Sequence, residues 1–188
     1  MKDAIIVDID GTAALGIGEH RQAYDYHLVG RDKPNIAVFI NIFSFWNLFP
    51  EGIVFFFSGR ENVTFPGKSK RKDKCYRVGK FQGREYPDCK TLTKAWLGHY
   101  LLEFQAILNE EESARTGNIC VSLPKDWRLS MRDAGDYRKD DEVKYDMYDY
   151  GVKGRYRVHY VLDDRQQVVD MWRDKCNLTC FQVAPGDF

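Results

Sequence analysis

Short apolar runs and amphipathic, helix-length segments alternate along the first third of the chain. Residues 4–9 (AIIVDI) and 53–57 (IVFFF) are almost entirely apolar, a pattern typical of parallel strands that are covered on both faces. Between them, residues 34–49 begin with Pro34 and place apolar side chains three to four positions apart, which predicts a helix. Strand, helix and strand in this order predict a βαβ unit.

The rest of the chain continues this alternation. A long helix is predicted at 89–110, where large apolar residues recur every fourth position from Leu92 to Leu108. Further strands are predicted at 118–123, 158–162 and 179–183, and a short helix at 166–175, while 124–157 is charged and mixed in composition. This order predicts an α/β fold, a three-layer sandwich around a mainly parallel, Rossmann-like sheet.

Composition adds that the chain is expected to be a single globular domain over residues 1–188. Hydrophobic residues make up 44% of the chain, which argues against wholesale disorder. Lys plus Arg and Asp plus Glu both number 28, so the net charge is zero. A strongly basic nucleic-acid-binding protein is therefore excluded, although a local basic patch is not.

The cysteines and the hydropathy of the chain indicate the cellular compartment in which the protein is expected. The five cysteines show neither CxxC nor Cys/His spacing, which argues against a disulfide framework or a zinc site. Reduced thiols and the absence of a secretory signal predict a cytoplasmic protein. The uncharged stretch from Pro34 to Pro50 is shorter than the roughly 20 residues of a membrane-spanning helix, so no membrane partner is expected.

Polar residues follow three of the predicted strands. They are Asp8 and Asp10 after the first strand, Ser58 and Arg60 after the second, and Asp163 and Asp164 after the strand at 158–162. Because ligands bind at the carboxyl ends of parallel strands, these side chains are expected to converge. Four carboxylates at one place repel each other unless a cation lies between them, and oxygen ligands favour a hard ion such as Mg²⁺.

A nucleophilic carboxylate, a second carboxylate two residues on, a Ser/Arg pair and a Mg²⁺ site together indicate phosphoryl transfer. That chemistry requires an in-line nucleophile, cations to neutralise the equatorial oxygens and an acid for the leaving group. A single aspartate at a strand end can equally be a cap or a turn residue. The three motifs in this order on strand ends are a far more specific pattern than the DIDGT motif at 8–12 alone.

These motifs, with a lysine between the second and third, resemble the haloacid dehalogenase (HAD) superfamily of phosphatases. The stretches 55–61, 135–144, 162–173 and 181–188 look like the 3′-phosphatase domain of phage-type polynucleotide kinase/phosphatase. The resemblance covers almost the whole chain apart from about 62–87. It implies a HAD-type sheet and a Mg²⁺-dependent polynucleotide 3′-phosphatase that works through an aspartyl-phosphate intermediate.

The resemblance also implies the biological setting. Such an enzyme removes 3′-phosphates from DNA or RNA ends in nucleic-acid repair, with a separate kinase or ligase as a candidate partner. Within the family, bifunctional members carry a P-loop kinase. Here Gly67, Lys68 and Ser69 lack the earlier glycine of a P-loop, because Asn62 occupies that position. No 5′-kinase activity is therefore expected.

Catalytic roles follow from the same resemblance. Asp8 is the nucleophile, and Asp10 is the acid for the leaving oxygen and then the base for water. Ser58 and Arg60 bind the phosphoryl group, and Lys144 neutralises it. Lys139 competes with Lys144 for this role, and either could instead be a solvated surface lysine.

Metal and substrate contacts complete the implied site. Asp8, the backbone carbonyl of Asp10, Asp163 and Asp164 hold Mg²⁺, with Asp164 as a direct ligand. The implied substrate contacts come from a group of residues near the strand ends and in 132–140, namely Thr12, Gly59, Arg132, Arg138, Lys139 and Asp140. Asp140 and Lys144 are four residues apart, so they share a helix face and could pair.

Two segments interrupt the motifs. Residues 13–33 form a cap too short to close the site, which suits a polymer end. Within it, His20 and Arg21 could reach a phosphate or lie on the surface. The insertion at about 62–87 is strongly basic over 68–84, with Tyr76 and Phe81 interleaved. It is either an arm that binds the phosphate backbone and stacks on a terminal base, or a solvated loop.

Two other functions remain open from the sequence. One is a HAD phosphatase that acts on nucleotides or small phosphoesters, and the other is a non-catalytic module that binds nucleic-acid ends. All acidic positions of the motifs are intact, which argues against the non-catalytic module.

Overall fold

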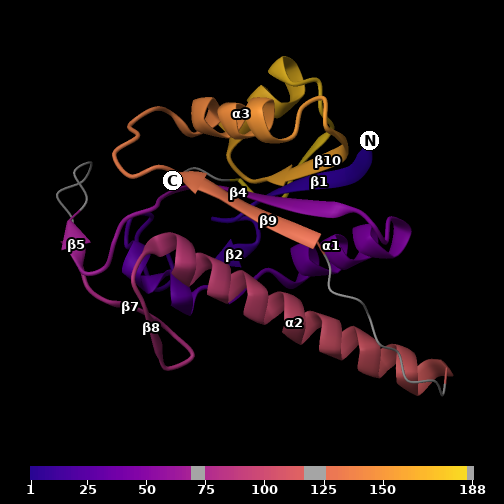
Figure 1. The fold of residues 1–188 in the computed structure, drawn as a ribbon, viewed down its shortest axis with the longest axis horizontal. Coiled ribbons are helices and arrows are strands. Elements are labelled where there is room, and N and C mark those ends of the chain that lie inside the picture. Colours follow the sequence, from indigo (N-terminus) through magenta and orange to yellow (C-terminus); the bar gives the residue numbers. More distant parts are fainter. Residues whose placement is uncertain (69–74, 117–125, 186–188) are drawn as a thin grey trace.

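A five-stranded sheet, all of whose strand pairs are parallel, forms the centre of the molecule (Figure 1). The structure is a computed structural model that describes residues 1–68, 75–116 and 126–185. The strands lie in the order β11-β10-β1-β4-β9. Their bounds are Lys2–Asp8 for β1, Ile53–Glu61 for β4, Asp126–Arg132 for β9, Tyr156–Asp163 for β10 and Cys180–Gln182 for β11.

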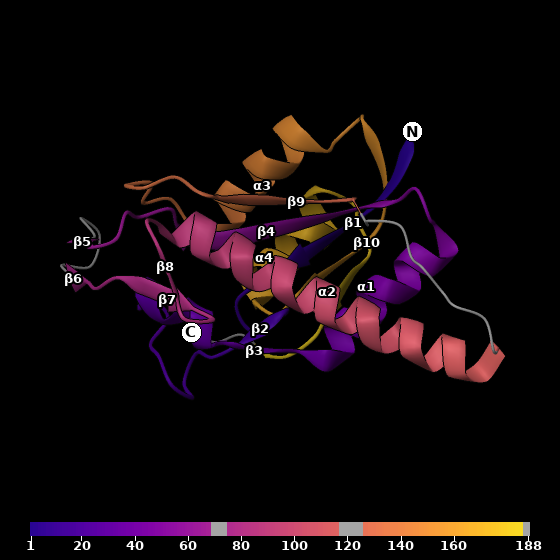
Figure 2. The same cartoon turned by 60° about the horizontal axis from the view of Figure 1, so that its bottom comes forward.

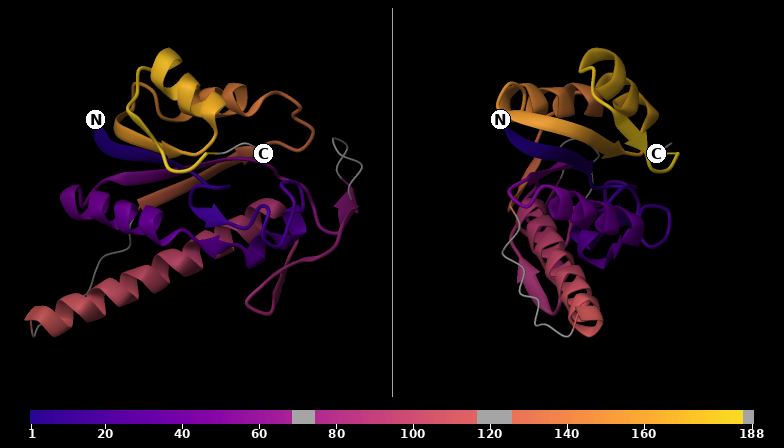
Figure 3. Two further views of the ribbon diagram at one scale, coloured as in Figure 1. Left: turned by 180° about the vertical axis from the view of Figure 1, so that it is seen from behind. Right: turned by 90° about the vertical axis from the view of Figure 1, so that its right-hand side faces the viewer.

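Helices cover both faces of this sheet, so the predicted three-layer α/β sandwich is confirmed (Figure 3). On one face lie α1 (Ile36–Leu48) and α2 (Cys89–Thr116). On the other lie α3 (Asp140–Gly151) and α4 (Gln166–Asp170), which runs on into a π-helical turn, Met171–Lys175. Within the described residues, no helix combines the length and the apolar character needed to cross a bilayer.

The strand β4 explains why its sequence is apolar without alternation. Val54 and Phe56 pack into the core beneath α1 and α2, whereas Phe55 and Phe57 pack into the core beneath α3 and α4. Successive side chains of a strand point to opposite faces, so a strand with a core on each side must be apolar at every position. The run at 53–57 was therefore correctly interpreted as a buried parallel strand.

The stretch 124–157 holds two elements that its composition hid. The edge strand β9 pairs with β4 alone and is exposed or half-buried over its first five residues, which masks the strand pattern. The helix α3 begins with three acidic residues, Asp140 to Glu142, which complement the positive end of the helix dipole. The strand predicted at 118–123 lies outside the described residues.

The two interrupting segments contain short ladders rather than irregular loops. In the cap segment, β2 (Ala14–Leu15) pairs with β3 (Lys33–Pro34), and the 3₁₀ helix η1 (Tyr26–Arg31) lies between them. In the insertion, two antiparallel pairs form. They are β5 (Gly67–Lys68) with β6 (Cys75–Tyr76), and β7 (Gly79–Phe81) with β8 (Arg84–Tyr86).

The aromatic residues of the insertion correct one expectation. Tyr76 and Phe81 are buried, at 4% and 7% exposure, so neither can stack on a terminal base as predicted. They instead join the core formed with α1 and α2, and this packing anchors the described part of the insertion, which is not a solvated loop. The predicted basic arm also included residues 69–74, which lie outside the described residues.

Truncating the centre of β4 should destabilise the fold. Phe56 is fully buried in the core beneath α1 and α2, and Phe56→Ala is expected to cost about 3–5 kcal/mol of unfolding free energy, since it leaves a cavity. Urea denaturation measures this change. Leu102→Ala is the matched control, because Leu102 is 74% exposed and should change stability by less than about 0.5 kcal/mol. Equal losses in the two variants would contradict the assigned core.

Candidate active site

Three parallel strands deliver the polar motifs to the same edge of the sheet. Asp8 ends β1, Asp163 ends β10 with Asp164 just after it, and Ser58 to Arg60 lie just before Glu61, the last residue of β4. Asp8, Gly59 and Arg60 line a cavity of about 170 Å³ at this edge. The convergence expected from the strand ends is therefore present in the structure.

A buried ammonium group joins two of these strands. Lys144 Nζ donates to Asp8 Oδ1 at 2.6 Å and to Asp163 Oδ2 at 2.8 Å. Lys144 is only 2% exposed, because it lies on the inner face of α3 with Val143 and Tyr148. The competing Lys139 directly precedes α3, and its exposed side chain lines the cavity. Of the two lysines, only Lys144 forms ion pairs with the acids.

The acids of this cluster are held close together away from water. Burial raises the pKa of Asp8 well above its ordinary value, and the charges of Asp163 and Asp164 add to this effect while Lys144 opposes it. Burial and the charge of Asp163 raise the pKa of Asp164 to about 6. Burial alone lowers the pKa of an ammonium, yet the charges of Asp163 and Asp8 leave the pKa of Lys144 raised.

The donor set fits a divalent cation. One carboxylate oxygen from each of Asp8, Asp163 and Asp164 lies within 4.8 Å of the others. Three carboxylates face one ammonium, so the cluster keeps a net charge of −2 when all are ionised. Asp163 already accepts from Lys144 and from Trp172 Nε1. The Asp164 carboxylate instead accepts a long hydrogen bond from Thr12 and none from the Lys144 ammonium, so Asp8 and Asp164 retain oxygen capacity for a metal ion.

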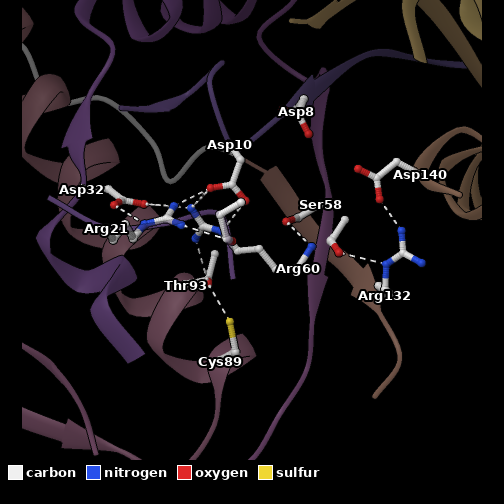
Figure 4. A network of polar contacts seen from close by, with 12 residues as sticks. Asp8, Asp10, Arg21, Asp32, Ser58, Arg60, Cys89, Thr93, Arg132 and Asp140 are labelled. Carbon is white, nitrogen blue, oxygen red and sulfur yellow. Dashed lines mark hydrogen bonds and ion pairs between the residues drawn. The ribbon is translucent and has the colours of Figure 1, made fainter. Parts of the chain in front are cut away.

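Asp10 belongs to a second, charge-balanced network (Figure 4). Arg60 donates to Asp10 Oδ2 at 2.7 Å and Oδ1 at 2.8 Å, and Arg21 donates to Asp10 Oδ1 at 2.5 Å. Both arginines also donate to Asp32, which is fully enclosed. Two guanidinium groups and two carboxylates thus tie the cap segment to β4.

This network changes the interpretation of two predicted residues. Arg60 lines the cavity, but its guanidinium is occupied by Asp10, Asp32 and the Thr93 hydroxyl. Burial by itself would raise the pKa of Asp10, but the charges and hydrogen bonds of Arg60 and Arg21 lower it well below its ordinary value. Asp10 is therefore an ionised carboxylate in this state, and its role as an acid stays a prediction.

Arg132 corrects another expectation. The resemblance implies a substrate contact for this residue, yet Arg132 is 1% exposed and cannot reach a strand outside the protein. Its guanidinium donates to the carbonyls of Gly59 and Arg138 and to the Asp140 carboxylate. The end of the edge strand turns this side chain inward, where it fastens β4 to the loop before α3 (Figure 4).

Three further residues that the resemblance implies as substrate contacts, Gly59, Arg138 and Asp140, make contacts within the protein. Asp140 pairs with Arg132 and Arg165 rather than hydrogen-bonding Lys144, whose charge helps to lower the Asp140 pKa against the effect of burial. A Cβ on Gly59 would lie 2.5 Å from the Asp140 carboxylate, so any other residue here would displace that carboxylate. Arg138 is half-exposed and engaged by Asp136 and Asp146.

The buried hydroxyl groups of Ser58 and Thr12 make hydrogen bonds next to the acidic cluster. Ser58 Oγ accepts from the backbone N–H of Arg60 at 3.1 Å, and Thr12 lies within 3.4 Å of Asp164. The turn that carries Thr12 depends on Gly11, whose φ of +80° disfavours other residues.

Sequence reasoning missed Asp32 and Arg165. Asp32 lies in a polar segment with no motif around it, and its importance is apparent from the contacts that Arg21, Arg60 and His20 make with its carboxylate. Arg165 directly follows the Asp163–Asp164 pair at the end of β10, so its position at a strand end could have indicated that it lines the cavity, as it does.

Removing one arginine from the balanced network should destabilise the protein. Arg21→Met leaves Asp10 and Asp32 with the guanidinium of Arg60 and, beside Asp32, the imidazole of His20. A buried carboxylate that loses its charged partner is expected to cost about 3–5 kcal/mol. Urea denaturation at neutral pH tests this. In the control Arg138→Met, two ion pairs of a half-exposed arginine are lost, those with Asp136 and Asp146, and stability should change much less than in Arg21→Met. If Arg21→Met unfolds at the same urea concentration as the wild-type protein, the network contributes little to the free energy of unfolding.

Comparison with known proteins agrees with this geometry. A family model described as the polynucleotide kinase PNKP phosphatase domain, of the HAD type, matches residues 2–95 and 103–188. A putative bifunctional polynucleotide kinase/RNA ligase of Autographa californica nuclear polyhedrosis virus is 26% identical over 182 residues, which are 96% of this chain and 19% of that protein.

Solved structures show the same fold. Chains of two Pnkp1/Rnl/Hen1 complexes, one described as an RNA repair complex, are 29% and 28% identical with TM-scores of 0.67 and 0.66. They cover all of this chain, which spans 44% and 48% of theirs. The family match extends over nearly every described residue and includes each strand that supplies the acidic cluster. The chain therefore belongs to the HAD-type polynucleotide kinase phosphatase domain family.

Proposed function

We propose that this chain is a Mg²⁺-dependent polynucleotide 3′-phosphatase that acts through an aspartyl-phosphate. The observation that carries the proposal is the buried cluster in which Lys144 contacts Asp8 and Asp163, with Asp164 beside them, at the wall of a polar cavity. A carboxylate held by an ammonium and next to a cation site suits nucleophilic attack on a phosphoryl group.

In the first step, a carboxylate oxygen of Asp8 attacks phosphorus and the bond between phosphorus and the 3′-oxygen breaks. Lys144 orients Asp8 through its 2.6 Å contact and offsets the charge of the phosphoryl oxygens. The departing 3′-oxygen takes a proton, which we assign to Asp10. Water then attacks the aspartyl-phosphate, Asp10 accepts its proton, and inorganic phosphate leaves with Asp8 restored.

Proton donation by Asp10 requires a change from the state seen here. A bound phosphoryl group would compete with Asp10 for the guanidinium of Arg60, which lines the cavity. Moving that contact to the phosphate removes an interaction that lowers the Asp10 pKa, and the negative phosphate raises it further. Arg60 would then bind the phosphoryl group and release Asp10 for acid–base work.

Asp8 and Asp164, with Asp163 alongside, are the residues that would hold Mg²⁺. When bound, the ion neutralises phosphoryl oxygens and offsets the mutual repulsion of the acids.

RNA ends are the substrate that the comparisons favour. The viral relative is a putative kinase/RNA ligase, and one of the similar structures is an RNA repair complex. The same names support a ligase as the partner that acts on the 3′-hydroxyl product. DNA ends remain within the proposal, because neither strand type is assigned by a 2′-hydroxyl contact.

Replacing the nucleophile should abolish phosphate release while the fold persists. Asp8→Asn keeps the shape of the side chain but removes the attacking oxyanion. Phosphate release is measured from a 3′-phosphorylated RNA oligomer with Mg²⁺ and with EDTA, beside the 3′-mononucleotide. Wild-type protein should turn over the oligomer only with Mg²⁺, and faster than the monomer. Activity retained in Asp8→Asn excludes the nucleophile, and equal rates on both substrates favour a small-phosphoester phosphatase.

Metal binding should also appear without turnover. At a Mg²⁺ concentration about 100-fold above Kd, binding to the folded state alone stabilises it by about 2.7 kcal/mol. Thermal denaturation should show this increase in wild-type protein and a loss of most of it in Asp164→Asn. The control Asp174→Asn removes an exposed acid from the helical turn after α4 and should respond as wild type does. A full Mg²⁺ response in Asp164→Asn contradicts the assigned ligand set.

A further inference from the structure

Two shallow cavities flank the candidate active site, and they carry opposite charge. The first lies between α3 and the turn after α4 and shares Gln167 with the catalytic cavity. Its lining holds four carboxylates and one lysine, namely Asp141, Glu142, Asp170, Asp174 and Lys175. A polyanion that leaves the catalytic cavity in this direction meets like charge.

The second cavity, which we call the η1 groove, is lined by η1 and the insertion. The helix η1 and the strand β7 of the insertion lie side by side (Figure 2). Its volume is about 580 Å³, and it is lined by His27, Leu28 and Arg31 of η1 and by Arg77, Lys80 and Glu85 of the insertion. The same short helix supplies Tyr26 to the wall of the catalytic cavity. The helix η1 therefore separates the two cavities and lines both.

The positively charged side chains that line the η1 groove favour the binding of an anion. Arg31, Arg77 and Lys80 are all exposed. Lys80 pairs with Glu85 at 3.0 Å, an ion pair with both partners more than half exposed. Among the described residues, neither Arg31 nor Arg77 has an acidic partner. Two guanidinium groups thus remain available to ligands, and guanidinium is well suited to phosphate.

The groove is a built feature rather than a chance meeting of two loops. Tyr26 of η1 stacks on Tyr76 of the insertion, with ring centroids 5.7 Å apart, and both rings are buried. Gly30 packs so closely on β7 that a Cβ there would lie 2.3 Å from the Lys80 carbonyl oxygen. These contacts fix Arg77 and Lys80 of the insertion relative to η1, and so relative to the catalytic cavity.

We propose that the η1 groove binds the backbone phosphates of a single nucleic-acid strand whose 3′-phosphate occupies the catalytic cavity. This inference rests on the proposed function and specifies its substrate as a polymer that crosses η1. Arg31 and Arg77 contact phosphates upstream of the end, and the acidic cavity near α4 directs the strand away from the opposite side. The groove, rather than the catalytic cavity, thereby favours a polymer over a mononucleotide.

The test compares two double variants that remove the same charge. Arg31→Ala with Arg77→Ala empties the groove of its unpaired cations. Lys153→Ala with Arg155→Ala removes two exposed cations just before β10, at the opposite end of the sheet. The affinity for a 5′-fluorescent, 3′-phosphorylated RNA oligomer of roughly ten nucleotides is measured by anisotropy in EDTA over a range of salt concentrations.

Loss of two phosphate contacts should reduce the slope of log K against log salt by roughly 1.4 for a single strand. The Arg31/Arg77 variant should show this reduction, and its advantage in kcat/KM for the oligomer over the 3′-mononucleotide should shrink with Mg²⁺ present. The control variant should keep both the slope and the advantage. An unchanged slope in the Arg31/Arg77 variant, or an equal loss in the control, overturns the groove as the strand path.

The two proposals fail separately. If wild-type protein releases no phosphate from the oligomer, the proposed 3′-phosphatase activity is wrong, yet the salt slopes measured in EDTA still decide whether the groove binds the strand. If wild-type protein releases phosphate and the Arg31/Arg77 variant keeps the wild-type slope, only the strand path is wrong.

Discussion

The single ammonium of Lys144 is the constraint on which the rest of the site depends. It joins the carboxylate that ends β1 to the carboxylate that ends β10, inside a protein interior where unpaired charge is costly. Without it, Asp8, Asp163 and Asp164 would bring three negative charges to one buried place. With it, the repulsion is reduced but not removed. The cluster keeps a net negative charge, and this charge attracts a divalent cation.

The network around Asp10 differs from the Lys144 cluster in its charge balance. Asp10 and Asp32 meet two arginines, and every charge there has a partner of opposite sign. A balanced, enclosed network fixes structure, and here it fastens the cap segment to β4. An unbalanced cluster, by comparison, gains from a ligand. The difference in charge balance separates the two halves of the DIDGT motif. Asp8 faces the place where a cation and a phosphate fit, while Asp10 is held by guanidinium groups that a phosphate could attract.

The sequence predicts the parts of the site that depend on local patterns, and it does not predict contacts between segments that lie far apart in the sequence. Asp8, Ser58 and Asp163 follow apolar runs directly, so strand ends alone place them at one edge of a parallel sheet. The pairing of Asp32 with Arg60 joins segments that no local pattern connects. The edge strand β9 escaped detection because only one of its sides is paired. Arg132 resembled a surface cation in a charged stretch, and only the fold shows that it is buried.

The size of the catalytic cavity limits how much of a substrate its walls can contact. Its volume of about 170 Å³ is much smaller than the roughly 580 Å³ of the η1 groove, so a polymer would extend beyond its walls. Any preference for a polymer must come from surfaces next to the cavity, where binding of remote groups contributes to the transition state. The acidic cavity beside α4 opposes a polyanion and the η1 groove attracts one. Because η1 lines both the groove and the catalytic cavity, the proposed strand path joins the two across a single short helix.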